Sequence, residues 1–205
     1  MGIFVKICGI AATGDVEAVA SLGPDAMGFV LWPGSPRYVQ PRDAAAWMRE
    51  IPKEILKVGV FVKPTPGEVA RAVAEIGLDV AQIHGVEDAS RFNDLAIRLW
   101  KAAYAEKDST ASLAAWHVDA ILLDTYCKDA PGGTGRVGDG QAARTFVLTC
   151  PHRVILAGGL TPENVAHAVR EVGPWGVDVS SGVEEQPGKK DVARVRAFIE
   201  TCRSL

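Results

Sequence analysis

The sequence repeats one pattern eight times: a short apolar run suited to a buried strand, then a segment with helical spacing. The apolar runs are nearly continuous, as expected for parallel strands covered on both faces. Regular alternation of this kind predicts a parallel α/β fold. Strands are expected at residues 3–8, 26–31, 56–62, 79–84, 99–104, 119–124, 153–157 and 176–180. Helices are expected at residues 15–22, 41–51, 66–76, 87–97, 109–116, 141–148, 162–172 and 191–202.

The number of repeats distinguishes two parallel α/β architectures. Eight strand–helix units within 205 residues predict a closed (β/α)8 TIM barrel near the smallest size of that fold. The alternative is a doubly wound open sheet, but the segment CGIAATG after the first strand lacks the GxGxxG pattern of that fold. No linker or low-complexity tract interrupts the chain, so we expect residues 1–205 to form a single domain.

Composition limits the class of function. Hydrophobic residues make up 48% of the chain and charged residues 23%, which is ordinary for a soluble globular protein. With a net charge of −3 and no long basic run, nucleic acid and anionic membranes are not expected as partners. No apolar run is long enough for a membrane span and the N-terminus lacks a signal-peptide pattern, so we expect a cytoplasmic protein.

The cysteines do not indicate a metal site. Cys8, Cys127, Cys150 and Cys202 show no CxxC spacing, and no histidine lies near them in a zinc-ligand pattern. We therefore expect no structural metal. Disulfide bonds are not expected either, because cytosolic thiols are kept reduced.

Polar residues gather at the carboxyl ends of the expected strands, where TIM barrels place their active sites. Those that lie two residues apart on one strand share a face of the sheet. The pattern predicts a polar pocket at this end of the barrel. The residues are Lys6 and Cys8, Gln82 and His84, Asp124, and Asp178 and Ser180.

Cys8 and Asp124 are the candidates for chemistry. Lys6 shares a face with Cys8, and a cation beside a thiol lowers its pKa and favours the reactive thiolate. Asp124 ends the apolar run AILLD, where burial would raise the pKa of its carboxyl toward that of a general acid. The alternatives are that Cys8 is a small buried apolar residue and that Asp124 caps a helix or forms a salt bridge.

Two segments at the seventh and eighth strands predict a phosphate site. LAGGLTPENV (156–165) and VDVSSGV (177–183) each follow a strand with glycine, and backbone N–H groups there can face an anion. The alternative is that these glycines only form tight turns. The glycine-rich segment DAPGGTGRVGDG (129–140) is either a surface loop or a lid with further phosphate contacts.

Arg37 lies in the proline-rich segment PGSPRYVQP (33–41). Arginine in a stiff loop suits bidentate recognition of a carboxylate, and the alternative is an ordinary surface arginine. Gln82 and His84 are either ligand contacts or internally satisfied polar residues at the mouth of a strand.

Together these motifs resemble phosphoribosylanthranilate isomerase. The resemblance implies a (β/α)8 barrel of tryptophan biosynthesis that uses no cofactor. The implied reaction is the Amadori rearrangement of N-(5′-phosphoribosyl)anthranilate to 1-(2-carboxyphenylamino)-1-deoxyribulose 5-phosphate. The matching segments span nearly the whole chain in order: VKICGI, SPRYV, KVGVFV, DVAQIHG, LLDT with GGTG, ILAGGLTPENV and GVDVSSGVE.

The resemblance also implies residue roles. Cys8 is implied as the general base, Asp124 as the general acid, and Arg37 as a contact of the anthranilate carboxylate. We expect the substrate as partner and a monomer or homodimer as the assembly. Further substrate contacts are expected from Lys6, Gln82, His84 and Asp178. The implied phosphate-binding residues are Gly132, Gly133, Gly135, Gly158, Gly159, Ser180, Ser181 and Gly182.

Two other functions are alternatives. A lyase similar to indole-3-glycerol-phosphate synthase would be expected to use a lysine–glutamate pair, whereas Cys8 and Asp124 hold the key strand ends here. A non-catalytic phosphosugar-binding barrel, in which Cys8 is structural, is not excluded by fold alone. The presence of both a candidate acid and a candidate base favours the isomerase.

Overall fold

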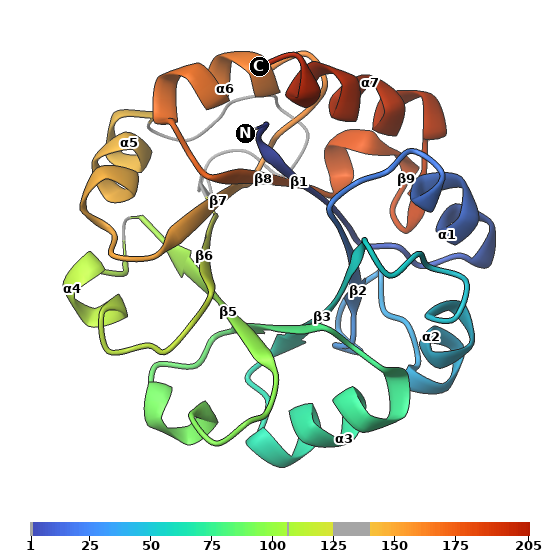
Figure 1. The fold of residues 1–205 in the computed structure, drawn as a ribbon, viewed down its shortest axis with the longest axis horizontal. Coiled ribbons are helices and arrows are strands. Elements are labelled where there is room, and N and C mark those ends of the chain that lie inside the picture. The colour runs from blue at the N-terminus through green and yellow to red at the C-terminus, as the bar shows by residue number, and fades with distance from the viewer. Residues whose placement is uncertain (1, 106, 125–139) are drawn as a thin grey trace.

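The computed structural model describes residues 2–105, 107–124 and 140–205. Eight parallel strands form a closed barrel in which each strand pairs with its neighbour in sequence and β8 pairs with β1. Figure 1 looks through the ring of strands, with the helices outside it. The predicted TIM barrel is confirmed. The strands are β1 (Phe4–Cys8), β2 (Ala26–Val30), β3 (Leu56–Val62), β4 (Val80–His84), β5 (Arg98–Tyr104), β6 (Ala120–Asp124), β7 (Arg153–Ala157) and β8 (Gly176–Val179).

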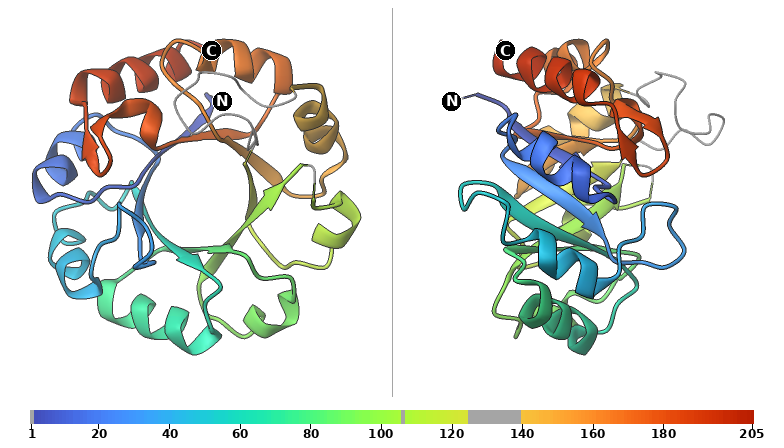
Figure 2. Two further views of the ribbon diagram at one scale, coloured as in Figure 1. Left: turned by 180° about the vertical axis from the view of Figure 1, so that it is seen from behind. Right: turned by 90° about the vertical axis from the view of Figure 1, so that its right-hand side faces the viewer.

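Helices form the outer layer, as the side view in Figure 2 also shows. Helix α3 begins with a capping box, in which the Thr65 hydroxyl accepts from Glu68 N and the Glu68 carboxylate accepts from Thr65 N. It ends at Gly77, whose φ of 77° is left-handed. The helices are α1 (Thr13–Ala20), α2 (Pro41–Trp47), α3 (Pro66–Ile76), α4 (Thr110–Leu113), α5 (Gly140–Thr149), α6 (Val165–Val172) and α7 (Val192–Arg203).

The prediction of a helix at residues 87–97 is wrong. The structure has only a short 3-10 helix there, η1 (Ala89–Phe92). The Asp88 carboxylate accepts hydrogen bonds from Ser90 N and Ser90 Oγ, and this local turn replaces the first turn of an α-helix. The helix predicted at 109–116 is likewise reduced to the four residues of α4.

A small hairpin after β8 was not predicted. It follows the 3-10 helix η2 (Ser181–Val183) and consists of β9 (Glu184–Gln186) and β10 (Lys189–Lys190). Gly188 lies between its strands with a φ of 83°, a conformation that glycine adopts without strain. In Figure 1 this hairpin lies between α7 and α1, at the junction of the last and first repeats.

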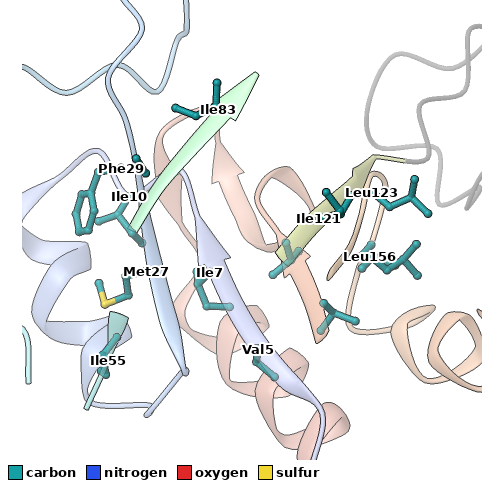
Figure 3. Close-up of a cluster of buried hydrophobic side chains, with 14 of the residues drawn as sticks. Val5, Ile7, Ile10, Met27, Phe29, Ile55, Ile83, Ile121, Leu123 and Leu156 are labelled. Atoms are coloured by element: carbon teal, nitrogen blue, oxygen red, sulfur yellow. The ribbon is translucent and has the colours of Figure 1, made fainter. Parts of the chain in front are cut away.

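Alternation along the strands separates two apolar layers. Val5, Ile7, Leu123 and Leu156 belong to the large cluster between the barrel and its helices, part of which Figure 3 shows. Residues of the opposite parity form a smaller cluster inside the barrel. At its base, Phe4 stacks on Trp175 with ring centroids 4.5 Å apart and meets Trp100 edge-on. These rings pack against one another at the amino-terminal end of the barrel, opposite the carboxyl ends of the strands.

The helices of the described residues include none long and apolar enough to cross a membrane.

Helix α7 should stabilise the ring through Phe198, which is completely buried in the outer core. Phe198→Ala should lower the free energy of unfolding by about 3–5 kcal/mol, because it leaves a cavity. Leu148→Ala is the control, because Leu148 is 74% exposed and its replacement should change stability by about 0.5 kcal/mol or less. Urea unfolding measures both, and equal losses would contradict the assignment of Phe198 to the core.

Candidate active site

The end of β1 places Lys6 and Cys8 inside the barrel, as the alternation predicted. Lys6 is the register partner of Asp178 on β8, and its Nζ lies 2.8 Å from Asp178 Oδ1. The Lys6 side chain is completely buried. Although burial disfavours its charge, the Asp178 carboxylate holds the pKa of Lys6 above its ordinary value. The site therefore contains a permanent internal cation.

Gly28 on β2 makes room for this arrangement, and sequence reasoning missed it. Gly28 is the register partner of Cys8. A Cβ at this position would lie 2.8 Å from Cys8 Sγ and 3.0 Å from Lys6 Nζ. With a side chain at position 28, the tips of Cys8 and Lys6 would have to shift from these positions. A glycine inside the apolar run AMGFV was the available signal, because glycine within a strand often marks a close approach.

Lys6 lowers the pKa of Cys8, as the sequence predicted, but this effect is outweighed in the site without substrate. Burial raises the pKa of the Cys8 thiol, and the opposing charge of Lys6 does not compensate. The physical reason is that a buried thiolate loses more hydration than one neighbouring ammonium returns, particularly with Asp178 also close by. Burial therefore favours the neutral thiol of Cys8.

Asp124, at the end of β6, shows the predicted shift. Burial, assisted by repulsion from Asp178, raises the pKa of its carboxyl to about 6. The protonated fraction of Asp124 near neutral pH is therefore larger than for an ordinary aspartate. A carboxyl with a pKa this close to neutrality suits a general acid.

Gln82 and His84 interact with each other at the end of β4. Their Nε2 atoms are 2.8 Å apart. Burial, together with the charges of Lys6 and Lys101, lowers the pKa of His84 to about 4, so the neutral ring accepts the amide N–H of Gln82. Gln82 Oε1 is buried and has no hydrogen-bond partner among the described residues. That oxygen is an acceptor available to a ligand.

Arg37 reaches the same end of the barrel but is already paired. Its Nε and Nη2 donate to the two carboxylate oxygens of Glu184 at 2.8 and 2.6 Å. Lys190 Nζ also donates to Glu184, at 2.8 Å. Sequence reasoning missed both Glu184 and Lys190, because VEEQPGKK carries several charges in a turn and nothing in the pattern marks which of them are buried.

The segments after β7 and β8 contact each other closely. Gly158 and Gly159 have left-handed φ values of 91° and 65°. Asn164 fixes this turn by donating from Nδ2 to Gly159 O. A Cβ on Gly182 would lie 1.9 Å from Leu160 O, so Gly182 is required by packing between the two segments. The predicted contacts Gly132, Gly133 and Gly135 lie outside the described residues.

One cavity of about 240 Å³ joins these groups. Arg37 lies at its edge: a Cβ on Gly9, the residue after Cys8, would meet both Arg37 Cδ and Ser180 Oγ. Within the described ranges, no group of three or more His, Cys, Asp and Glu residues is placed to hold a metal ion. The cavity lining includes Cys8, Gln82, His84, Asp124 and Asp178, and also Gly158, Gly159, Ser180, Ser181 and Gly182.

Comparison with known proteins agrees with the motifs. Residues 5–201 match the family PRAI: N-(5'phosphoribosyl)anthranilate (PRA) isomerase. An N-(5'-phosphoribosyl)anthranilate isomerase from Magnetococcus marinus is 43% identical over 204 residues, which cover 99% of this chain and 96% of the relative.

Solved structures show the same likeness. The phosphoribosyl anthranilate isomerase of Thermotoga maritima superposes with a TM-score of 0.89 at 35% identity, covering 99% of this chain and 100% of the other. A phosphoribosyl anthranilate isomerase in complex with reduced 1-(o-carboxyphenylamino)-1-deoxyribulose 5-phosphate superposes with a TM-score of 0.83 at 33% identity. That match covers 99% of this chain and 100% of the other.

The reactivity of Cys8 should reflect its burial. In the protein without ligand, the rate of Cys8 alkylation by iodoacetamide should rise only above the pH at which ordinary thiols ionise. Lys6→Met should raise the pKa of Cys8 further, because it removes the opposing cation. Lys189→Met is the control, since Lys189 is exposed on the hairpin. Mass spectrometry of the Cys8 peptide measures the rate, and ionisation below the ordinary thiol pKa would contradict the dominance of burial over the charge of Lys6.

Proposed function

Because the chain belongs to the N-(5'-phosphoribosyl)anthranilate isomerase family, we propose that Cys8 and Asp124 carry out the acid–base chemistry of that isomerase. The activity is that of EC 5.3.1.24 in tryptophan biosynthesis, the conversion of N-(5′-phosphoribosyl)anthranilate to 1-(2-carboxyphenylamino)-1-deoxyribulose 5-phosphate. The observation that carries the proposal is that a thiol and a carboxyl with a raised pKa line one cavity, beside two glycine-containing strand ends.

Asp124 opens the furanose ring. Its protonated carboxyl gives a proton to the ring oxygen, and the C1–O bond breaks to leave an iminium ion at C1. The raised pKa of Asp124 supports this role, because it keeps a protonated fraction available near neutral pH. Asp178 contributes by repelling the ionised form of Asp124.

Cys8 then removes the proton from C2 as a thiolate. The reactive pair is a Cys8 thiolate with a protonated Asp124, whereas the dominant pair is a Cys8 thiol with an ionised Asp124. Both pairs hold one proton, so moving that proton from Cys8 to Asp124 converts the dominant pair into the reactive one. The positive iminium ion adds to the charge of Lys6 beside the sulfur, and both favour the thiolate. The resulting enolamine tautomerises to the ketone product.

Substrate binding is assigned to the groups around the acid–base pair. The phosphate would bind the backbone N–H groups of Gly158–Gly159 and Ser180–Gly182, two adjacent segments that both line the cavity. Arg37 would bind the anthranilate carboxylate through the edge of its guanidinium that Glu184 does not occupy. The unpaired Gln82 Oε1 would accept a hydrogen bond from the substrate.

Replacing either proposed catalytic residue should remove turnover without unfolding the protein. Cys8→Ala and Asp124→Asn should each lower kcat by at least about 10²-fold, since each removes one proton-transfer group. Loss of substrate fluorescence measures turnover, and titration with the reduced product analogue measures retained binding.

Cys150→Ala is the control for cysteine removal, because Cys150 is half-buried and lies outside the cavity. Near-native turnover in Cys8→Ala would exclude Cys8 as the base. Loss of the folded state in that variant would instead favour a structural role.

The pH dependence should identify the influence of Asp178 on Asp124. Activity requires one proton on the Cys8–Asp124 pair, so kcat/KM should fall as pH drops through the pKa of Asp124, about 6. Asp178→Asn should shift this acidic limb to lower pH, because the negative neighbour is removed and Lys6 loses its partner. Steady-state kinetics between pH 4.5 and 10 measure the shift, with wild type as reference. An acidic limb of kcat/KM that stays in place or moves to higher pH contradicts the influence of Asp178 on Asp124.

A further inference from the structure

The motif GVDVSSGVE ends in Glu184, a residue to which the proposed mechanism gives no role. The Glu184 side chain is only 3% exposed, whereas the next residue, Glu185, is 51% exposed and pairs with Lys189. Burying a carboxylate is unfavourable unless charged partners compensate. Two cations bind Glu184: Arg37 contacts both carboxylate oxygens, and Lys190 contacts Oε1. Arg37, Glu184 and Lys190 therefore form a charged triad around a buried carboxylate.

The geometry of the Arg37–Glu184 pair restricts the guanidinium. The Nε and Nη2 atoms form two hydrogen bonds with the two carboxylate oxygens, a bidentate arrangement that fixes both the position and the plane of the group. The Arg37 side chain remains 21% exposed. The Nη1 atom takes no part in this pair, and the Arg37 Cδ and Nε atoms lie beside Gly9, the residue after β1.

Lys190 also fixes the Glu184 carboxylate. Its side chain is completely buried and its Nζ donates to Glu184 Oε1 and, at 3.2 Å, to Ser180 O. Its backbone N–H donates to Asp15 Oδ2 at the start of α1. The hairpin is thereby tied to both the first and the last repeat. The Arg37–Glu184–Lys190 triad carries a net charge of +1, which suits one carboxylate.

We propose that Glu184 is a positioning residue for the substrate carboxylate. Glu184, which also binds Lys190, holds the Arg37 guanidinium at the edge of the cavity, so that the site selects substrates with a negative ring substituent. This inference rests on the proposed function. Glu184 acts only through Arg37, so its loss should weaken carboxylate binding and leave the acid–base pair in place.

The test compares two ligands in matched variants. One ligand is reduced 1-(o-carboxyphenylamino)-1-deoxyribulose 5-phosphate, and the other is the same compound without the ring carboxylate. In wild type the carboxylate should tighten binding. In Glu184→Gln this advantage should fall by roughly tenfold or more, because Arg37 loses its bidentate partner. The KM of the substrate should rise by a similar factor while kcat changes less.

Glu185→Gln is the matched control, since it makes the same chemical change one residue away on an exposed side chain, and it should leave both ligands and KM unchanged. A merely structural role for Glu184 predicts that Glu184→Gln weakens both ligands equally, and that result would overturn the proposal. An unchanged or lower KM in Glu184→Gln would also overturn it.

Two further measurements complete the experiment. Should Glu184→Gln fail to fold because Lys190 is left unpaired, Glu184→Gln with Lys190→Met removes both buried charges, and the carboxylate advantage should still be lost. Arg37→Ala separates the two hypotheses. Loss of the carboxylate advantage in Arg37→Ala but not in Glu184→Gln overturns only the positioning role, whereas failure of wild type to bind either ligand overturns the proposed function itself.

Discussion

The buried ion pair between Lys6 and Asp178 is the interaction on which the site depends. It joins the first and last strands of the barrel inside the ring, above the aromatic residues that fill the base. Removing one partner of a buried pair leaves an uncompensated charge and typically costs about 3–5 kcal/mol. The same two charges also act on the proposed catalytic groups: Lys6 favours the Cys8 thiolate, and Asp178 raises the pKa of Asp124. One pair thus links the stability of the barrel closure to its chemistry.

The barrel could be predicted because its strands are buried on both faces. Continuous apolar runs identify such strands without reference to their neighbours, and all eight were located within a residue or two. The outer layer was less predictable. Residues 87–97 have the spacing of a helix, but Asp88 and Ser90 form a local turn that competes with it. Such competition depends on side-chain hydrogen bonds that an apolar pattern does not describe.

The site was predictable where it depends on strand parity. Cys8, Gln82, Asp124 and Asp178 line the cavity, and Lys6 lies beside Asp178, because these side chains face the interior of the barrel. What could not be predicted depends on contacts across the chain. Gly28 matters only because it opposes Cys8, and Glu184 only because it meets Arg37, 147 residues away. The net shift of the Cys8 pKa could not be predicted for the same reason, since the sequence shows the neighbouring cation, which does lower this pKa, but not the burial that outweighs it.

The contacts of Lys6 and Arg37 also have a consequence for how the protein is made. Both residues leave the ribosome early, but their partners, Asp178 and Glu184, belong to the eighth repeat. Domains of this kind are synthesised from the N-terminus at about 5–20 residues per second. Lys6 is therefore synthesised roughly 9–34 s before Asp178, 172 residues later. Burying the lysine without its counter-ion is unfavourable, which opposes early closure around the first strands. The last repeat supplies both the strand that closes the ring and the counter-ion of Lys6, so closure of the barrel and charge pairing in the site depend on the same segment of the chain.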